Sequence, residues 1–99
     1  MSCLDRFDKP IKVDDWVEVV EQGKINHHIN MVGYIGRVEE VGEGSCQVNC
    51  YSNGCGAIEG KCLRVIAEPD RATKLRIGYD SYVLLREEYK RLGRLEYET

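Results

Sequence analysis

The sequence predicts a single, mainly β domain of short antiparallel strands that ends in a C-terminal α-helix. Three observations predict it. Apolar residues alternate with polar ones around Val17 and Val19 and again from Cys46 to Cys50, an Asn-Gly pair stands at 53–54, and an amphipathic stripe follows residue 80. A chain of 99 residues is long enough for one hydrophobic core, and 42% hydrophobic with 31% charged residues is a globular balance.

We divide the domain, residues 1–99, into three parts. Residues 1–10 form a lead-in segment in which Leu4 and Phe7 are expected to pack against the core. Residues 11–68 form a small antiparallel barrel, and residues 69–99 form a helical C-terminal extension.

The first three strands are predicted from alternation. The turn at Asp14 and Asp15 opens the first strand, and a long polar loop over 22–31 follows it. The second strand lies in 32–44, where two glycines indicate a sharp bend, and the third lies in 45–52.

The pair Asn53-Gly54 predicts a two-residue hairpin turn. A strict turn of this kind would direct charged residues of the next strand into the core. We therefore predict a bulge at Gly56 or Gly60, which shifts the register by one residue and brings Ile58 and Cys62 inward.

Turn and capping residues mark the bounds of the elements predicted in the last part of the chain. A fourth strand covers 55–68 and ends before Pro69-Asp70, and the segment 73–79 is predicted as a further short strand. A helix capped by Asp80 or Ser81 runs to Leu92 and ends at Gly93. Its apolar stripe consists of Tyr82, Leu85, Tyr89 and Leu92.

The order of these segments (VDDWVEVV, a polar loop, VGYIGRVEEV, the Asn-Gly hairpin and a strand ending in CLRVI) resembles the small SH3-like barrels. The resemblance covers Lys12 to Ile66 and is to KOW-type modules and small accessory subunits of photosynthetic complexes. It implies a surface used for docking rather than a particular activity. KOW-type modules commonly meet RNA or RNA polymerase, and Gly36 matches their motif glycine. Acidic residues replace the basic ones that usually serve RNA: Glu39, Glu40 and Glu43.

The five cysteines are predicted to be reduced, because the count is odd and MSCLDRFDKP is too polar for a secretory signal. Cys46, Cys50, Cys55 and Cys62 share one predicted hairpin, but their gaps of three, four and six residues do not match the tight pairs of zinc sites. We therefore expect core cysteines, no metal and no cofactor. A zinc-stabilised domain is the weaker alternative.

No residue pattern indicates catalysis. The serines lie in turns or at chain ends without a partner base, and GEGSC lacks the lysine and helix of a phosphate-binding loop. The loop histidines His27 and His28 are either solvated or in contact with a partner. We expect the protein not to be an enzyme.

Charge is unevenly distributed along the chain. Residues 1–70 carry seven basic and twelve acidic side chains, a net of −5, and residues 71–99 carry seven and five, a net of +2, which together give the total of −3. Acidic residues of the first two strands are either a solvated surface or a docking patch for a basic partner, and outward aromatic residues either contact a partner or lie under the C-terminal helix. The partner-binding candidates are Asp14, Asp15, Trp16, Glu18, Tyr34, Glu39, Glu40 and Tyr51.

These observations predict a noncatalytic protein-interaction module, an adaptor or an inhibitor of a larger protein, which is basic if the acidic residues form the docking patch. The alternative is a KOW-like module that binds RNA or the transcription or translation machinery through the basic tail, which contains Arg71, Lys74, Arg76, Arg86, Lys90, Arg91 and Arg94. No apolar run reaches the length of a membrane span, and we expect a cytoplasmic protein. An open edge strand would also allow a homodimer.

Overall fold

The computed structural model describes residues 2–25, 30–51, 54–79 and 81–93. Within them lie five strands, one short 3-10 turn and two helices. In chain order these are β1 (Trp16–Val19), β2 (Ile35–Val41), β3 (Ser45–Asn49), β4 (Cys55–Glu59), the 3-10 turn η2 (Gly60–Cys62), β5 (Leu63–Ile66), α1 (Arg71–Arg76) and α2 (Ser81–Arg91).

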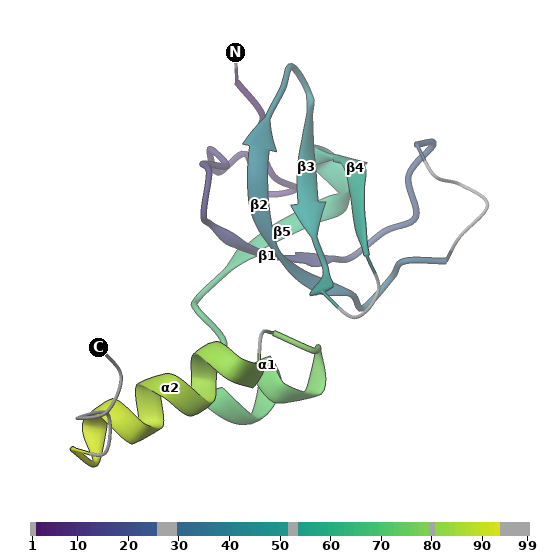
Figure 1. Cartoon of the computed structure of the whole chain (residues 1–99). Helices are drawn as coiled ribbons and strands as arrows, with labels where there is room; N and C mark the ends of the chain where they lie inside the picture. The colour runs from purple at the N-terminus through teal and green to yellow at the C-terminus, as the bar shows by residue number, and fades with distance from the viewer. Residues whose placement is uncertain (1, 26–29, 52–53, 80, 94–99) are drawn as a thin grey trace.

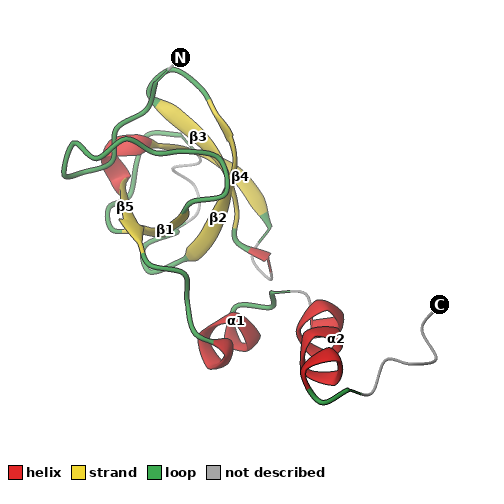
Figure 2. Ribbon diagram, turned by 90° about the vertical axis from the view of Figure 1, so that its left-hand side faces the viewer, coloured by secondary structure: helices red, strands yellow, loops and turns green. Residues whose placement is uncertain are grey.

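The five strands form one antiparallel sheet in the order β4-β3-β2-β1-β5, so the last strand returns to lie beside the first (Figure 1). In Figure 2 the strands curve around a common centre. Among the described residues no pairing joins β4 to β5, so the sheet is not closed into a barrel. The prediction of a mainly β, antiparallel domain is confirmed, and a closed barrel is not.

The core lies on one face of this sheet. The predicted inward residues Val17 and Val19 of β1 are buried, as are Cys46 and Val48 of β3 and the following Cys50. These side chains form one cluster with residues from β2, β4 and β5. The period-two pattern therefore identified the core side of the first and third strands correctly.

The predicted bulge after the hairpin is wrong, although the inward residues are right. Asn49 pairs with Cys55, so the connection covers 50–54, and Cys46 then lies opposite Ile58 in a regular ladder. The longer connection corrects the register that a two-residue turn would have imposed. A register shift occurs instead in β2, between Val38 and Glu40.

The predicted fourth strand is in fact two strands, β4 and β5, separated by η2. The chain turns at Gly60, where a Cβ atom would lie 2.3 Å from the backbone oxygen of Leu4 and 2.4 Å from Sγ of Cys3. Only glycine fits this close approach of two backbones. Cys62 is buried, as predicted, but the 3-10 turn η2 rather than a bulge brings it inward.

The lead-in segment packs differently from the prediction. Leu4 and Phe7 are exposed, and Cys3 and Ile11 are buried in their place. The segment folds back on itself through a bridge between Leu4 and Pro10.

A buried carboxylate, that of Asp5, fixes this segment to the sheet. Its Oδ1 accepts hydrogen bonds from the backbone N–H groups of Phe7 (2.8 Å) and Lys9 (2.9 Å), and its Oδ2 accepts one from Val65 of β5 (3.0 Å). Burial alone would raise the pKa of Asp5, but these hydrogen bonds outweigh it and hold the pKa below the ordinary value of 3.8.

We expect Asp5→Asn to lower the free energy of unfolding by about 2 kcal/mol at neutral pH, because the amide cannot accept all three bonds. A lowered folded-state pKa contributes stability that is present above 3.8 and is lost as the pH falls through the folded pKa. Urea titrations from neutral to acidic pH should therefore show a smaller acid-dependent loss in the variant. The control Asp8→Asn changes an exposed carboxylate and should stay near wild type, and equal losses in both variants would contradict this role.

The segment 73–79, predicted as a strand, is mainly helical instead. Helix α1 begins after Asp70, whose carboxylate accepts a hydrogen bond from the N–H of Thr73 (2.8 Å). This N-cap and the run of helix formers behind it favour a helix over the predicted strand. The second helix is confirmed within 81–91 and ends before Gly93, which has a φ of +71°.

The two helices extend from one end of the sheet (Figure 1) and give the molecule principal extents of 48 × 26 × 20 Å. No helix within the described ranges is long and apolar enough to cross a membrane.

Candidate partner-binding face

The face of the sheet opposite the core, called here the outer face, is defined by the strand register. Trp16 of β1 lies opposite Arg37 of β2 and Ile66 of β5, and Arg37 lies opposite Asn49 of β3. Because residues directly opposite each other share a face, these side chains lie on one surface. Glu18 and Glu40 belong to the same surface by alternation and register.

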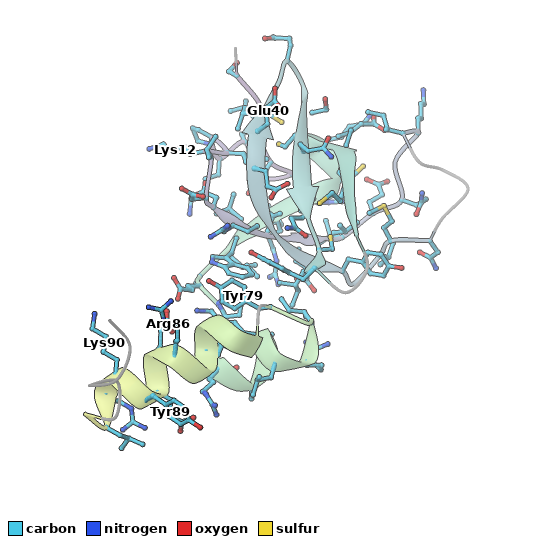
Figure 3. All side chains as sticks on the ribbon, viewed as in Figure 1. Lys12, Glu40, Tyr79, Arg86, Tyr89 and Lys90 are labelled. Atoms are coloured by element: carbon cyan, nitrogen blue, oxygen red, sulfur yellow. The ribbon has the colours of Figure 1, made fainter. Side chains whose placement is uncertain are left out.

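An aromatic cluster covers one end of the outer face. The ring of Trp16 lies 6.0 Å from that of Tyr51 and 5.7 Å from that of Tyr79, and the two tyrosine rings are 5.0 Å apart at an edge-on angle of 72°. Lys74 Nζ lies 5.8 Å from the Trp16 ring centre and 5.2 Å from that of Tyr79. Figure 3 shows Tyr79 between the sheet and the helices.

Trp16 is therefore covered rather than free for a partner, with 7% of its surface exposed. The sequence offered both possibilities, and cover by the C-terminal part of the chain is the one found. The residues that cover Trp16 are Lys74 of α1 and Tyr79 between the helices. Neither residue belongs to the apolar stripe of the helix that was predicted to cover the outward aromatic residues.

Tyr51 is held in an unusual position beside this cluster. Its backbone has a φ of +56°, and its N–H donates to Oδ1 of Asn49. Burial raises the pKa of the Tyr51 hydroxyl, against a smaller lowering effect of Arg37. Among the described residues, neither this hydroxyl nor Nε of Arg37 has a hydrogen-bond partner, although both atoms are buried.

Three of the predicted acidic residues serve local structure. Asp14 adopts a φ of +75° in the turn before β1, and its exposed carboxylate lies 3.9 Å from Nε of Arg37. Asp15 accepts a hydrogen bond from the N–H of Lys12 (2.9 Å). Glu18 forms an ion pair with Arg64 across β1 and β5.

The outer face is thus not uniformly negative, because two arginines stand among the predicted acidic residues. The exposed acidic side chains that remain on this face lie along β2. Glu39 and Glu40 are both exposed, and Glu39 accepts contacts from Asn49 Nδ2 (3.4 Å) and Cys55 Sγ (3.7 Å). We call Glu39 and Glu40 the acidic strip.

Tyr34 does not belong to this face. It precedes β2, and its partly buried side chain packs against the core cluster. The structure therefore brings Trp16 and Tyr51 together, places Glu39 beside Asn49 two residues before Tyr51, and separates Tyr34 from them.

The cysteines divide into four buried side chains and one exposed side chain, and all five are free thiols. Burial raises the pKa of Cys50 to about 11. Cys55 lies on the exposed part of β4, away from the core. No group of three or more histidine, cysteine, aspartate or glutamate side chains in the described part of the chain could hold a metal ion. The predicted loop histidines lie outside the described residues.

The basic residues of the extension are partly neutralised. Arg71 and Arg91 both contact Glu88, at 2.8 and 3.7 Å, and Lys74 pairs with Glu68 at 2.6 Å. In Figure 3, Arg86 and Lys90 project from the same side of α2. Arg94 lies outside the described residues.

Comparison with known proteins adds no family. No protein-family model matches the chain, and no curated protein matches it. The SH3-like and KOW-type resemblance accordingly stays a prediction.

Proposed function

We propose that the protein is a noncatalytic protein-interaction module, an adaptor or an inhibitor, that binds a basic partner through the acidic strip. The observation that carries this proposal is the position of Glu39 and Glu40. Both are exposed on β2, and Glu39 contacts the side chain of Asn49, whose Oδ1 accepts from the N–H of Tyr51 in the aromatic cluster. Exposed neighbouring carboxylates of this kind suit a partner with clustered lysines or arginines.

We further infer that the sheet is an open, SH3-like barrel. The strand order β4-β3-β2-β1-β5 and the curvature of the strands around one core support this inference. The acidic strip lies on the outer face of this sheet, where its exposed side chains are open to a partner.

Charge reversal tests the proposal. The double variant Glu39→Lys, Glu40→Lys should reduce capture of the partner from a lysate of the source organism about tenfold, because like charges would then meet across the interface. The control Glu87→Lys reverses an exposed carboxylate on α2 and should leave capture unchanged.

Nuclease treatment distinguishes this proposal from the RNA-binding alternative. A protein captured by wild type and by the α2 control, lost with the double variant and insensitive to nuclease, would support the proposal. Equal capture by all three proteins, or capture that disappears after nuclease treatment, would contradict it, and the nuclease result would favour the KOW-like RNA-binding alternative.

A further inference from the structure

Two thiols from distant parts of the sequence meet inside the core. Cys3 belongs to the lead-in segment and Cys46 to β3, 43 residues later, and their Sγ atoms are 3.4 Å apart. Both side chains are almost fully buried, at 3% and 2% exposed, and both are free thiols.

The contact is close to that required for a covalent bond. A disulfide bond is about 2.05 Å long, so the two sulfur atoms need to approach by about 1.4 Å. Cys3 stands outside the strands of the sheet, in a segment attached by a few hydrogen bonds, so the approach requires movement of this segment rather than of the sheet.

The folded core protects this pair at neutral pH. Burial, reinforced by the contact with Cys3, raises the pKa of Cys46 to about 12, so little thiolate is present. Reaction therefore requires the lead-in segment to open locally, which its bonds to β5 oppose: the Asp5 carboxylate accepts from Val65, and the N–H of Arg6 donates to the oxygen of Leu63.

We propose that Cys3 and Cys46 are a site of reversible oxidation, at which a low-molecular-weight disulfide such as glutathione disulfide forms an intramolecular disulfide that locks the lead-in segment onto β3. The opened Cys3 thiolate attacks one sulfur of glutathione disulfide, which gives a mixed disulfide and releases one glutathione thiolate. While the segment is still open and Cys46 is uncovered, Cys46 loses its proton to solvent and its thiolate attacks the Cys3 sulfur, which releases the second glutathione as a thiolate; the segment then closes with the disulfide in place. The two protein thiols lose two electrons and two protons, and one glutathione disulfide is reduced to two thiols.

The test uses the full chain in a Cys55→Ser background, because Cys55 is the exposed thiol and would react first. The protein is incubated with glutathione disulfide at mildly alkaline pH, and its disulfides are then mapped by mass spectrometry of unreduced peptides. We expect a linked peptide pair containing Cys3 and Cys46, a loss of two free thiols, and a thermal midpoint that rises by roughly 10 °C or more and returns to its original value after reduction.

Two further variants make the result decisive. Cys3→Ala in the same background should form no cross-link, and Asp5→Asn should form the Cys3–Cys46 link faster, because it weakens the attachment of the segment. Stable glutathione adducts without a cross-link, a link that involves Cys50 or Cys62, or no thiol loss even in the Asp5 variant would each overturn the proposal.

Discussion

Replacing Trp16 with alanine is expected to lower the free energy of unfolding by about 3–5 kcal/mol. Only 7% of the Trp16 surface is exposed, and its ring contacts rings from two other parts of the molecule. Its removal leaves Tyr51 and Tyr79 facing a cavity, and it also removes the surface on which Lys74 rests. Equilibrium unfolding in urea, followed by circular dichroism, measures this loss.

The same variant should also loosen the helices, because the aromatic cluster links the sheet to the C-terminal extension. Amide hydrogens of α1 are expected to exchange faster in Trp16→Ala than in wild type, while those of β3 keep most of their relative protection. The matched control is Phe7→Ala, which removes an aromatic ring that is 68% exposed and should cost less than about 0.5 kcal/mol. Similar costs for the two variants would mean that the cluster does not stabilise the protein.

A single methyl group at Gly36 should cost about 3 kcal/mol. A Cβ atom there would lie 2.6 Å from the backbone oxygen of Asn49, 2.9 Å from its carbonyl carbon and 2.7 Å from Cγ1 of Val48. Two of these atoms belong to the backbone of β3 or its end, so the neighbouring strand itself would have to move. The side chain of Val48 cannot give way either, because it is fully buried.

The control for this prediction is Gly42→Ala at the end of β2. There a Cβ atom would lie 3.4 Å from the oxygen of Ser45, an ordinary contact, so the stability should change by less than about 0.5 kcal/mol. Urea midpoints of the two variants decide the matter. If Gly36→Ala were as stable as Gly42→Ala, the close packing of β2 on β3 would be refuted.

Local patterns predicted the elements whose cause is local. Alternation identified β1 and β3, and Gly93 marked the end of α2. Segment 73–79 was predicted incorrectly, although its cause was also local. The carboxylate of Asp70 caps a helix that starts at Arg71, whereas the pair Pro69-Asp70 predicted only the end of a strand.

Features that depend on contacts between distant residues could not be predicted in the same way. The division of β4 from β5 at Gly60 follows from the approach of Leu4, more than fifty positions earlier in the chain. The mixed charge of the outer face depends on the register that places Arg37 and Arg64 beside the acidic residues. A single sequence gives the charges but not these pairings.

The attachment of the lead-in segment also bears on self-association. A strand at the end of a sheet normally offers its unpaired backbone groups to other molecules. At β5 two of these groups are already engaged, because the N–H of Val65 donates to Asp5 and the oxygen of Leu63 accepts from Arg6. A second copy that extended the sheet at β5 would first have to displace the chain's own N-terminal turn. This turn therefore opposes aggregation through the β5 edge.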